Sequence, residues 1–303
     1  MRAVLIVALA LFPLLPPVLA VQDATPRPLA ARIAHTDPAK YRPSPRVHGG
    51  PGQLDYMGLL DHASLDTNLF FLHRGVIQPK SGIGAHFHNQ CEEMFVILDG
   101  EAQFTVDGRT SVLQGPVGAP VRMGHSHAIY NHTDRPVQWM NINVSAVKAV
   151  YDAFDLGDPR VGVPLDPIPT FMTMRLDKAL LRPVEAMLGG KGTAHYRRAL
   201  GPSVFLGPWA YVDHLVLPAG ATVGPSTDAE FGAFYYVMDG SGRVTLGGET
   251  APIVRGDAIP VQLRSAKTFE NTGGAPLELL VVGVASDPQK KDGLLTRRPP
   301  PRG

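Results

Sequence analysis

The chain has little cysteine, little net charge and no long apolar run beyond its first residues. Cys91 is the single cysteine among 303 residues, so no disulfide can form within one chain, and stability must come from the core, a metal or oligomerisation. Lys and Arg number 28 and Asp and Glu 27, which gives a net charge of +1. This balance carries no electrostatic signature of nucleic-acid binding or of attachment to an anionic membrane.

The first twenty residues have the features of a secretory signal peptide. Arg2 supplies the positive start, an apolar run extends from Ala3 to Leu15, and a small residue, Ala20, ends the segment. The alternative, a membrane anchor, conflicts with the shortness of the run and with the prolines at positions 13, 16 and 17. We therefore expect a signal peptide over residues 1–20 and a periplasmic or secreted mature protein without a membrane anchor.

Short strands separated by turns are expected for most of the mature chain. The 29 prolines and 32 glycines of the full sequence disfavour long helices, while its 44% apolar residues can supply a core. Asp99-Gly100 and Asp107-Gly108 are typical of tight turns between strands. Strand-like apolar segments cover residues 69–72, 76–77, 94–98, 102–106 and 137–144. This pattern predicts an all-β barrel or sandwich.

An internal repeat divides the chain into two halves. A shift of 140 residues places residues 97–100 (Ile-Leu-Asp-Gly) on 237–240 (Val-Met-Asp-Gly), Gly108 on Gly248, and Asn131 on Asn271. The apolar segment 137–144 falls on 277–284 at the same shift. A register that is kept through several turns and a strand indicates two copies of one β-domain, at residues 51–150 and 195–287.

Three segments lie outside the two copies. For residues 21–50, rich in Pro, Arg and Ala, we expect either disorder or an extended N-terminal arm, draped over the partner subunit of a homodimer. Residues 151–194 are a connector that prolines keep extended at first, followed by a short helix at Lys178–Leu188 that Asp177 would cap and Pro183 would kink. Residues 288–303 are charged and proline-rich, and we expect a flexible tail.

The first copy contains an ordered set of metal-binding residue types. His86 and His88 are two positions apart, so in a strand they share one face while Phe87 points the other way. A turn then reverses the chain, and Glu93 at the start of the next strand can face the same interior. His127 has to arrive from a later strand to complete three imidazoles and one carboxylate. Such a set suits Mn, Fe, Cu, Ni or Zn and leaves coordination positions open.

In the order and spacing of these residues the first copy resembles the cupin superfamily. The first cupin motif runs from a glycine through His-x-His and Glu to a second glycine, and residues 86–100 match it, although the leading glycine is displaced. Gly124, His127 and Asn131 match the second motif, with Arg122 in place of its proline. The resemblance implies that one divalent transition metal is bound by His86, His88, Glu93 and His127.

The second copy lacks this ligand set. At the shift of 140, the four ligand positions hold Ser226, Asp228, Ala233 and Lys267. A tandem of one metal-binding and one metal-free copy resembles the bicupins, the group that includes oxalate decarboxylases and quercetin dioxygenases. The resemblance implies an all-β fold of two cupin-type β-barrels in tandem, each a double-stranded β-helix or jelly roll, with the metal in the N-terminal barrel.

Polar side chains next to the ligands allow more than one interpretation. Glu92 is the alternative to Glu93 as a ligand if the turn differs by one residue. Asn141 and Asn143 share one face of a strand, where the second copy has valine and glycine. This difference favours hydrogen bonds to a ligand or to the metal shell, and the alternative is that the face is solvent-exposed.

These features predict an exported, metal-dependent enzyme for a small-molecule substrate. Oxidation of a small oxygen-rich molecule by dioxygen is the leading function, because this chemistry is widespread among the proteins that the chain resembles. The alternatives are a metal-dependent isomerase or lyase acting on a sugar-like substrate, and a non-catalytic cupin that binds a small molecule or a metal. No residue stands out as the acid or base, and the candidates are Glu92, His125 and His73.

Overall fold

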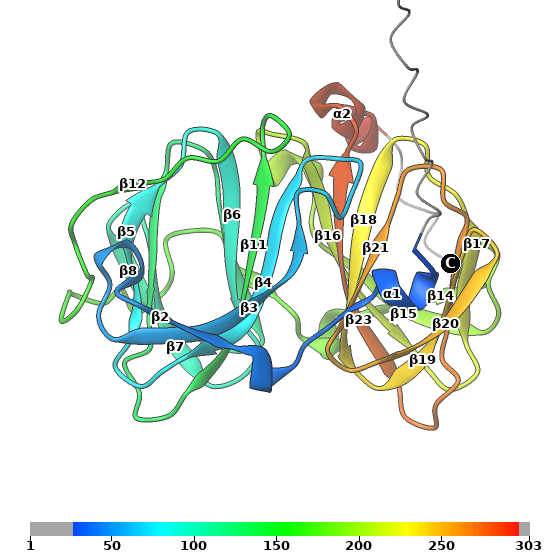
Figure 1. Cartoon of the computed structure of the whole chain (residues 1–303), viewed down its shortest axis with the longest axis horizontal. Helices are drawn as coiled ribbons and strands as arrows, with labels where there is room; N and C mark the ends of the chain where they lie inside the picture. Colours follow the sequence, from blue (N-terminus) through cyan, green and yellow to red (C-terminus); the bar gives the residue numbers. More distant parts are fainter. Residues whose placement is uncertain (1–26, 297–303) are drawn as a thin grey trace, which may run out of the picture.

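The computed structural model describes residues 27–296, which form two β-barrels lying side by side (Figure 1). The signal peptide predicted for residues 1–20 lies outside this range. Within the range, no helix combines the length and the apolar character needed to cross a membrane. The all-β prediction is confirmed, since the helices between residues 27 and 296 are α1 (Leu29–Arg32), α2 (Pro288–Thr296) and short 3-10 turns.

The first barrel consists of two antiparallel sheets. Its seven-stranded sheet runs in the order β13 (Met174–Arg175), β9 (Val117–Val121), β6 (Cys91–Ile97), β11 (Val137–Ser145), β4 (Leu69–Ile77), β3 (Gln53–Asp61) and β2 (Arg42–Pro45). Its five-stranded sheet runs in the order β12 (Phe154–Asp155), β5 (Gly82–Phe87), β10 (Ser126–Tyr130), β7 (Glu101–Val106) and β8 (Arg109–Gln114).

The second barrel has the same plan. Its seven-stranded sheet runs in the order β1 (Ala34–His35), β21 (Asp257–Val261), β18 (Phe231–Asp239), β23 (Leu277–Ala285), β16 (Trp209–Leu217), β15 (Thr193–Leu200) and β14 (Arg182–Glu185). The other sheet has four strands, in the order β17 (Thr222–Ser226), β22 (Lys267–Glu270), β19 (Ser241–Leu246) and β20 (Glu249–Val254). The shift of 140 residues therefore relates the copies in space: His127 lies opposite His86, and Lys267 lies opposite Ser226.

The structural repeat begins before residue 51. Asp37 and Asp177 each accept a hydrogen bond from the N–H two residues later, at 3.0 and 2.9 Å, and start the 3-10 turns η1 (Pro38–Lys40) and η3 (Lys178–Leu180). β2 and β14 follow, and then η2 (Val47–Gly49) and η4 (Met187–Gly189). The helix expected at Lys178–Leu188 is therefore wrong. Pro183 lies within β14, and its missing N–H and fixed φ exclude a helix interior.

The two copies exchange a short strand reciprocally. β1 of the first copy pairs with β21 of the second barrel, with Ala34 opposite Ala258. β13 of the second copy pairs with β9 of the first barrel, with Met174 opposite Gly118. The described part of the predicted arm, residues 27–50, thus packs on its own chain and is not disordered. The homodimer stays a prediction.

An apolar core joins the barrels. Leu72 of β4 and Met140 of β11 belong to the same buried cluster as Leu280 and Val282 of β23, and all four side chains are fully buried. Burying each such side chain contributes about 1.5–3 kcal/mol, so this shared core holds the two barrels together firmly. Separate clusters fill the interior of each barrel.

The segment after residue 287 is not a flexible tail throughout. Residues 288–296 form α2, which packs against the second barrel (Figure 1). The buried ammonium group of Lys291 donates hydrogen bonds to the carbonyl oxygens of Phe205 and Gly207, at 2.5 and 2.7 Å. The prediction for residues 288–303 is therefore wrong for its helical part, because these contacts fix Lys291.

Candidate metal centre

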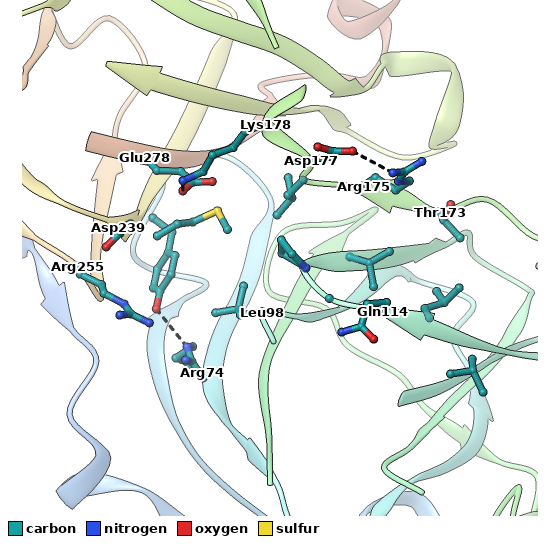
Figure 2. Close-up of a pocket in the computed structure, with 18 of the residues that line it drawn as sticks. Arg74, Leu98, Gln114, Thr173, Arg175, Asp177, Lys178, Asp239, Arg255 and Glu278 are labelled. Atoms are coloured by element: carbon teal, nitrogen blue, oxygen red, sulfur yellow. Dashed lines mark hydrogen bonds and ion pairs between the residues drawn. The ribbon is translucent and has the colours of Figure 1, made fainter. Parts of the chain in front are cut away.

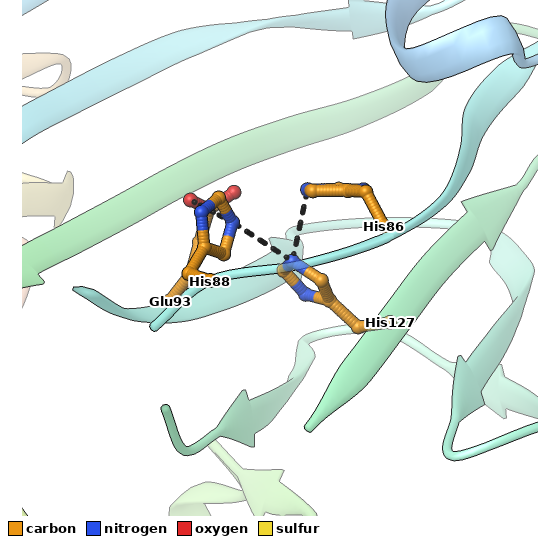
Figure 3. Close-up of side chains that lie close together, drawn as sticks. All are labelled: His86, His88, Glu93 and His127. Carbon is orange, nitrogen blue, oxygen red and sulfur yellow. Dashed lines mark hydrogen bonds and ion pairs between the residues drawn. The ribbon is translucent and has the colours of Figure 1, made fainter. Parts of the chain in front are cut away.

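The four predicted ligands converge inside the first barrel (Figure 3). The Nε2 atom of His127 lies 3.0 Å from Nε2 of His86 and 3.4 Å from Nε2 of His88. Nε2 of His88 lies 3.3 Å from an Oε atom of Glu93, and one atom from each of the four residues lies within 4.8 Å of the others. Donors about 2.1 Å from a shared ion lie about 3.0–3.4 Å apart at bond angles of 90–109°. The three distances of 3.0–3.4 Å are therefore those expected between donors that share one metal ion.

Strand register brings these ligands together. His86 lies in β5, directly opposite His127 of β10 in the same sheet. Glu93 lies in β6 of the other sheet, and β11 places Asn143 directly opposite it. His88 follows the end of β5 in the short turn that leads into β6. All four ligand side chains are at most 3% exposed, so bulk water does not compete for them.

Hydrogen bonds on the outer ring nitrogens orient two of the imidazoles. Nδ1 of His86 donates to the carbonyl oxygen of Gly84 at 2.8 Å, and Nδ1 of His88 donates to the carbonyl oxygen of Asp152. Nε2 of both rings faces the centre, and a neutral imidazole that keeps its proton on Nδ1 is the form that binds a metal. The ring of His127 is held differently, because it stacks on Phe95 with 4.5 Å between centroids and 2° between planes.

Two asparagines hold the carboxylate ligand. The amide of Asn141 donates to Oε1 of Glu93 at 2.7 Å, and that of Asn143 donates to Oε2 at 2.6 Å. Both asparagines are nearly or fully buried, so the alternative of a solvent-exposed face is wrong. The structure therefore favours the alternative in which the two asparagines support the metal shell, since each fixes one oxygen of the predicted ligand Glu93.

The pKa values of the cluster favour a bound cation. Burial alone would raise the pKa of Glu93, but the hydrogen bond from His88 and the surrounding imidazoles hold that pKa well below its usual range. Burial lowers the pKa of His86 to about 4 and that of His127 well below its usual value. Burial also acts to lower the pKa of His88, but its hydrogen bond to Glu93 raises it. A metal ion held by both side chains would take the place of the proton that His88 and Glu93 share.

The comparisons with known proteins agree with the repeat. The cupin domain family matches residues 73–143 and again residues 213–283, and the two matches are 140 residues apart. The chain is a bicupin.

Solved structures with the same fold include two enzymes. The bicupin is similar to an oxalate decarboxylase of Lactobacillus farciminis, with a TM-score of 0.61 and 13% identity over 84% of this chain and 86% of that one. It is also similar to a salicylate 1,2-dioxygenase of Pseudaminobacter salicylatoxidans, with a TM-score of 0.58 and 15% identity over 80% and 79% of the two chains. At these identities the likeness shows the fold alone.

One sequence relative has no assigned activity. An uncharacterized protein of Methanocaldococcus jannaschii is 24% identical over 109 residues, which are 36% of the bicupin and 86% of that protein. The match therefore covers about one cupin domain and leaves the reaction open.

A small cavity of about 90 Å³ adjoins the ligands of the bicupin. Glu93 and Asn141 form part of its wall, and the other lining residues are mainly aromatic or apolar: Val47, His48, Leu54, Tyr56, Phe71, His73, Ile83, Trp139 and Tyr151. Nε1 of Trp139 and Oδ1 of Asn141 are buried and have no hydrogen-bond partner among the described residues. Glu93, which lines the cavity, thus joins it to the ligand cluster.

The structure separates the three acid–base candidates. His73 lines the cavity, whereas His125 is exposed and places Nδ1 2.6 Å from Oδ2 of Asp107, outside the ligand cluster. The carboxylate of Glu92 accepts hydrogen bonds from the backbone N–H groups of Leu206 and Gly207, at 2.6 and 2.9 Å, and so faces the second barrel. Glu93, not Glu92, occupies the ligand position. Only His73 of the three is brought to the site.

Two segments that the sequence did not assign to the site contribute to it. The ring of His48 stacks on His86 with centroids 3.7 Å apart and 12° between planes, and its Nδ1 lies 2.5 Å from Oδ1 of Asp155. Asp155 belongs to β12 in the connector, and so the connector and the arm meet over His86. Asp152, also in the connector, orients His88 through its carbonyl oxygen.

The second barrel fills the equivalent space with its own side chains. Arg198 donates to both carboxylate oxygens of Asp213, at 2.9 and 3.2 Å, and its guanidinium lies 4.4 Å from the ring centroid of Tyr211. A Cβ atom added at Gly283 would lie 2.1 Å from the Tyr211 ring, so this ring occupies the space that Asn143 uses in the first barrel. Among the described residues, the clustered metal ligands are those of the first barrel.

A larger cleft of about 880 Å³ lies at the junction of the barrels (Figure 2). The buried guanidinium of Arg74 on its wall donates to the hydroxyl of Tyr236 at 3.1 Å, and Glu278 pairs with Lys178 and with His214, both at 2.7 Å. None of the four metal ligands lines this cleft. The cleft therefore belongs to the junction and not to the metal centre.

Proposed function

We propose that this bicupin is a metal-dependent oxidoreductase of the dioxygenase type that acts on a small, oxygen-rich substrate in its first barrel. The observation that carries the proposal is the cluster of three imidazoles and one carboxylate, in which the carboxylate, Glu93, also lines the 90 Å³ cavity. Four protein donors leave one or two positions of a transition metal free for exogenous ligands.

The metal would supply a Lewis acid and, for a redox-active ion, a means of binding dioxygen. The chain's own residues hold that centre in place. Asn141 and Asn143 fix both oxygens of Glu93, while Gly84 and Asp152 orient His86 and His88. The aromatic and apolar wall of the cavity excludes bulk water and strengthens polar contacts within it.

The volume of the cavity limits the substrate. The cavity of about 90 Å³ is well below the roughly 300–1,000 Å³ of pockets for drug-sized ligands, so it favours a small substrate. Among the described residues that line it, none is Lys or Arg, so the metal is the main positive charge available to an anionic substrate.

The same volume supports a second candidate, a metal-dependent lyase. A small carboxylic acid fits the cavity better than a sugar-like or flavonol-sized molecule. The bicupin also shares its fold with an oxalate decarboxylase. We propose decarboxylation of a small carboxylic acid as the alternative, and ligand capture without turnover as the third outcome.

Oxygen uptake separates these functions. We would load the purified protein with Mn, Fe or Cu and follow dioxygen with oxalate, catechols, flavonols and reducing sugars. The oxidoreductase predicts uptake in the wild type and in His125→Ala, an exposed control, and loss of uptake in His88→Ala. Release of carbon dioxide without net oxygen uptake would support the lyase, and thermal stabilisation by a ligand without turnover would support a binding protein.

We also propose that the protein is exported after removal of its first twenty residues. The proposed signal peptide predicts that the mature chain starts near residue 21 and is found in the periplasm or the medium. Intact-mass measurement of the protein from its native host tests this. A mature chain that retains residues 1–20 would contradict it.

A further inference from the structure

The cavity of the first barrel and an outer groove between that barrel and residues 27–34 of the arm meet at one pair of stacked rings. The 90 Å³ cavity beside the metal ligands and an outer groove of about 440 Å³ share Phe71 and His73 as lining residues. The rings of Phe71 and His73 stack face to face, with 4.0 Å between centroids and 7° between planes. The pair is therefore the partition between the groove and the cavity.

Gly58 keeps the groove side of this partition open. It lies in β3, opposite His73 of β4, and both residues line the groove. A Cβ atom added at Gly58 would meet only Cδ2 of His73, at 3.7 Å, which is an ordinary contact. Space for a side chain exists at this position, and the glycine leaves it free.

In the second barrel, side chains fill the space that corresponds to Gly58, Phe71 and His73. At the shift of 140, Gly58 becomes Arg198, Phe71 becomes Tyr211 and His73 becomes Asp213. These are the residues of the ion pair and stacked guanidinium described above, and they contact one another at 2.9–4.4 Å. In the second barrel, which lacks the ligand set, the Arg198 side chain fills this space. In the first barrel, which has the ligand set, Gly58 leaves the space unfilled.

We propose that small ligands reach the metal centre from this outer groove by displacement of the stacked Phe71–His73 pair, and that glycine at position 58 is required for the passage. The proposal depends on the metal centre of the proposed function but not on its reaction. The ligand class is set by the cavity, which favours small molecules.

Azide binding to the cobalt-loaded protein tests the route without an enzymatic assay. The Gly58→Arg variant introduces the residue of the second barrel, and Gly58→Ala is its matched control. Stopped-flow absorbance of the cobalt bands should show azide association slowed by roughly tenfold or more in Gly58→Arg, because a gating step then limits entry, and unchanged in Gly58→Ala. Cobalt content should be the same in both.

A variant with the opposite effect covers the case in which Gly58→Arg does not fold. Phe71→Ala removes one ring of the partition and should accelerate azide association. Equal rates in the wild type, Phe71→Ala and any folded Gly58→Arg would overturn the route, while failure of the wild type to bind cobalt would instead overturn the metal centre of the proposed function.

Discussion

Asn143 donates a hydrogen bond of 2.6 Å to Glu93, the residue directly opposite it in the neighbouring strand. The same position in the second barrel is Gly283, where a side chain would collide with the ring of Tyr211. One position of the repeat therefore supports a metal ligand in one barrel and makes room for a tyrosine in the other.

Replacing this asparagine should weaken metal binding without removing a ligand. Asn143→Leu keeps the approximate size of the side chain and loses the hydrogen bond that fixes Oε2 of Glu93. Loss of such a supporting contact typically weakens metal affinity about 10–100-fold. Competition with a chelator measures the change, and His125→Ala serves as the control because His125 lies outside the cluster. Equal affinities in Asn143→Leu and wild type would contradict the role assigned to Asn143.

Because the pKa of His73 is low, we expect acid to lower the free energy of unfolding of the metal-free protein. Burial lowers that pKa from 6.5 to about 4, although the Glu93 carboxylate opposes the change. Between these pH values the unfolded chain binds a proton at His73 that the folded chain does not, so acidification favours unfolding by up to about 1.4 kcal/mol per pH unit.

The variant His73→Phe isolates this contribution. It keeps an aromatic ring stacked on Phe71 and removes the titrating group, so its free energy of unfolding should fall less steeply from pH 6.5 to 4 than that of the wild type. Urea unfolding of chelator-treated protein at several pH values measures the two slopes. Parallel curves for His73→Phe and wild type would show that His73 is not buried as described.

Glu92 should contribute to stability and not to the metal site. Its carboxylate accepts two backbone hydrogen bonds from the loop at residues 206–207, and burial raises its pKa. Glu92→Ala leaves these N–H groups without their acceptor, which we expect to lower the free energy of unfolding by about 1–3 kcal/mol. Glu92→Gln retains one oxygen acceptor and should lose less. Denaturant unfolding with metal analysis checks this, and metal loss at unchanged stability would refute it.

The sequence predicted the ligand set because its signals are local and repeated. His86 and His88 show the strand period of two, and the shift of 140 residues identified both the repeat and the positions at which the second copy has lost its ligands. The pairing of β11 with β6 then places Asn143 opposite Glu93, so this contact follows from the strand register alone. These parts of the site depend on short-range periodicity, which a sequence displays directly.

The contacts that the arm and the connector make with the site could not be predicted from sequence periodicity. His48 reaches His86 through a backbone turn in which both Arg46 and His48 have positive φ, a conformation that no periodicity predicts. The exchanged strands β1 and β13 are two residues long and have no pattern of their own. One signal was available: Gly49-Gly50 recurs as residues 189–190 at the shift of 140, which extends the repeat to this segment.

Metal stoichiometry of the purified protein tests the central claim most directly. Native mass spectrometry with elemental analysis should find one transition-metal ion per wild-type chain and none in His127→Ala, in which the fold signature by circular dichroism is kept. A folded wild-type chain that takes up no ion when Mn, Fe, Cu, Ni and Zn are offered, or one ion still held in His127→Ala, would contradict a single four-ligand centre in the first barrel.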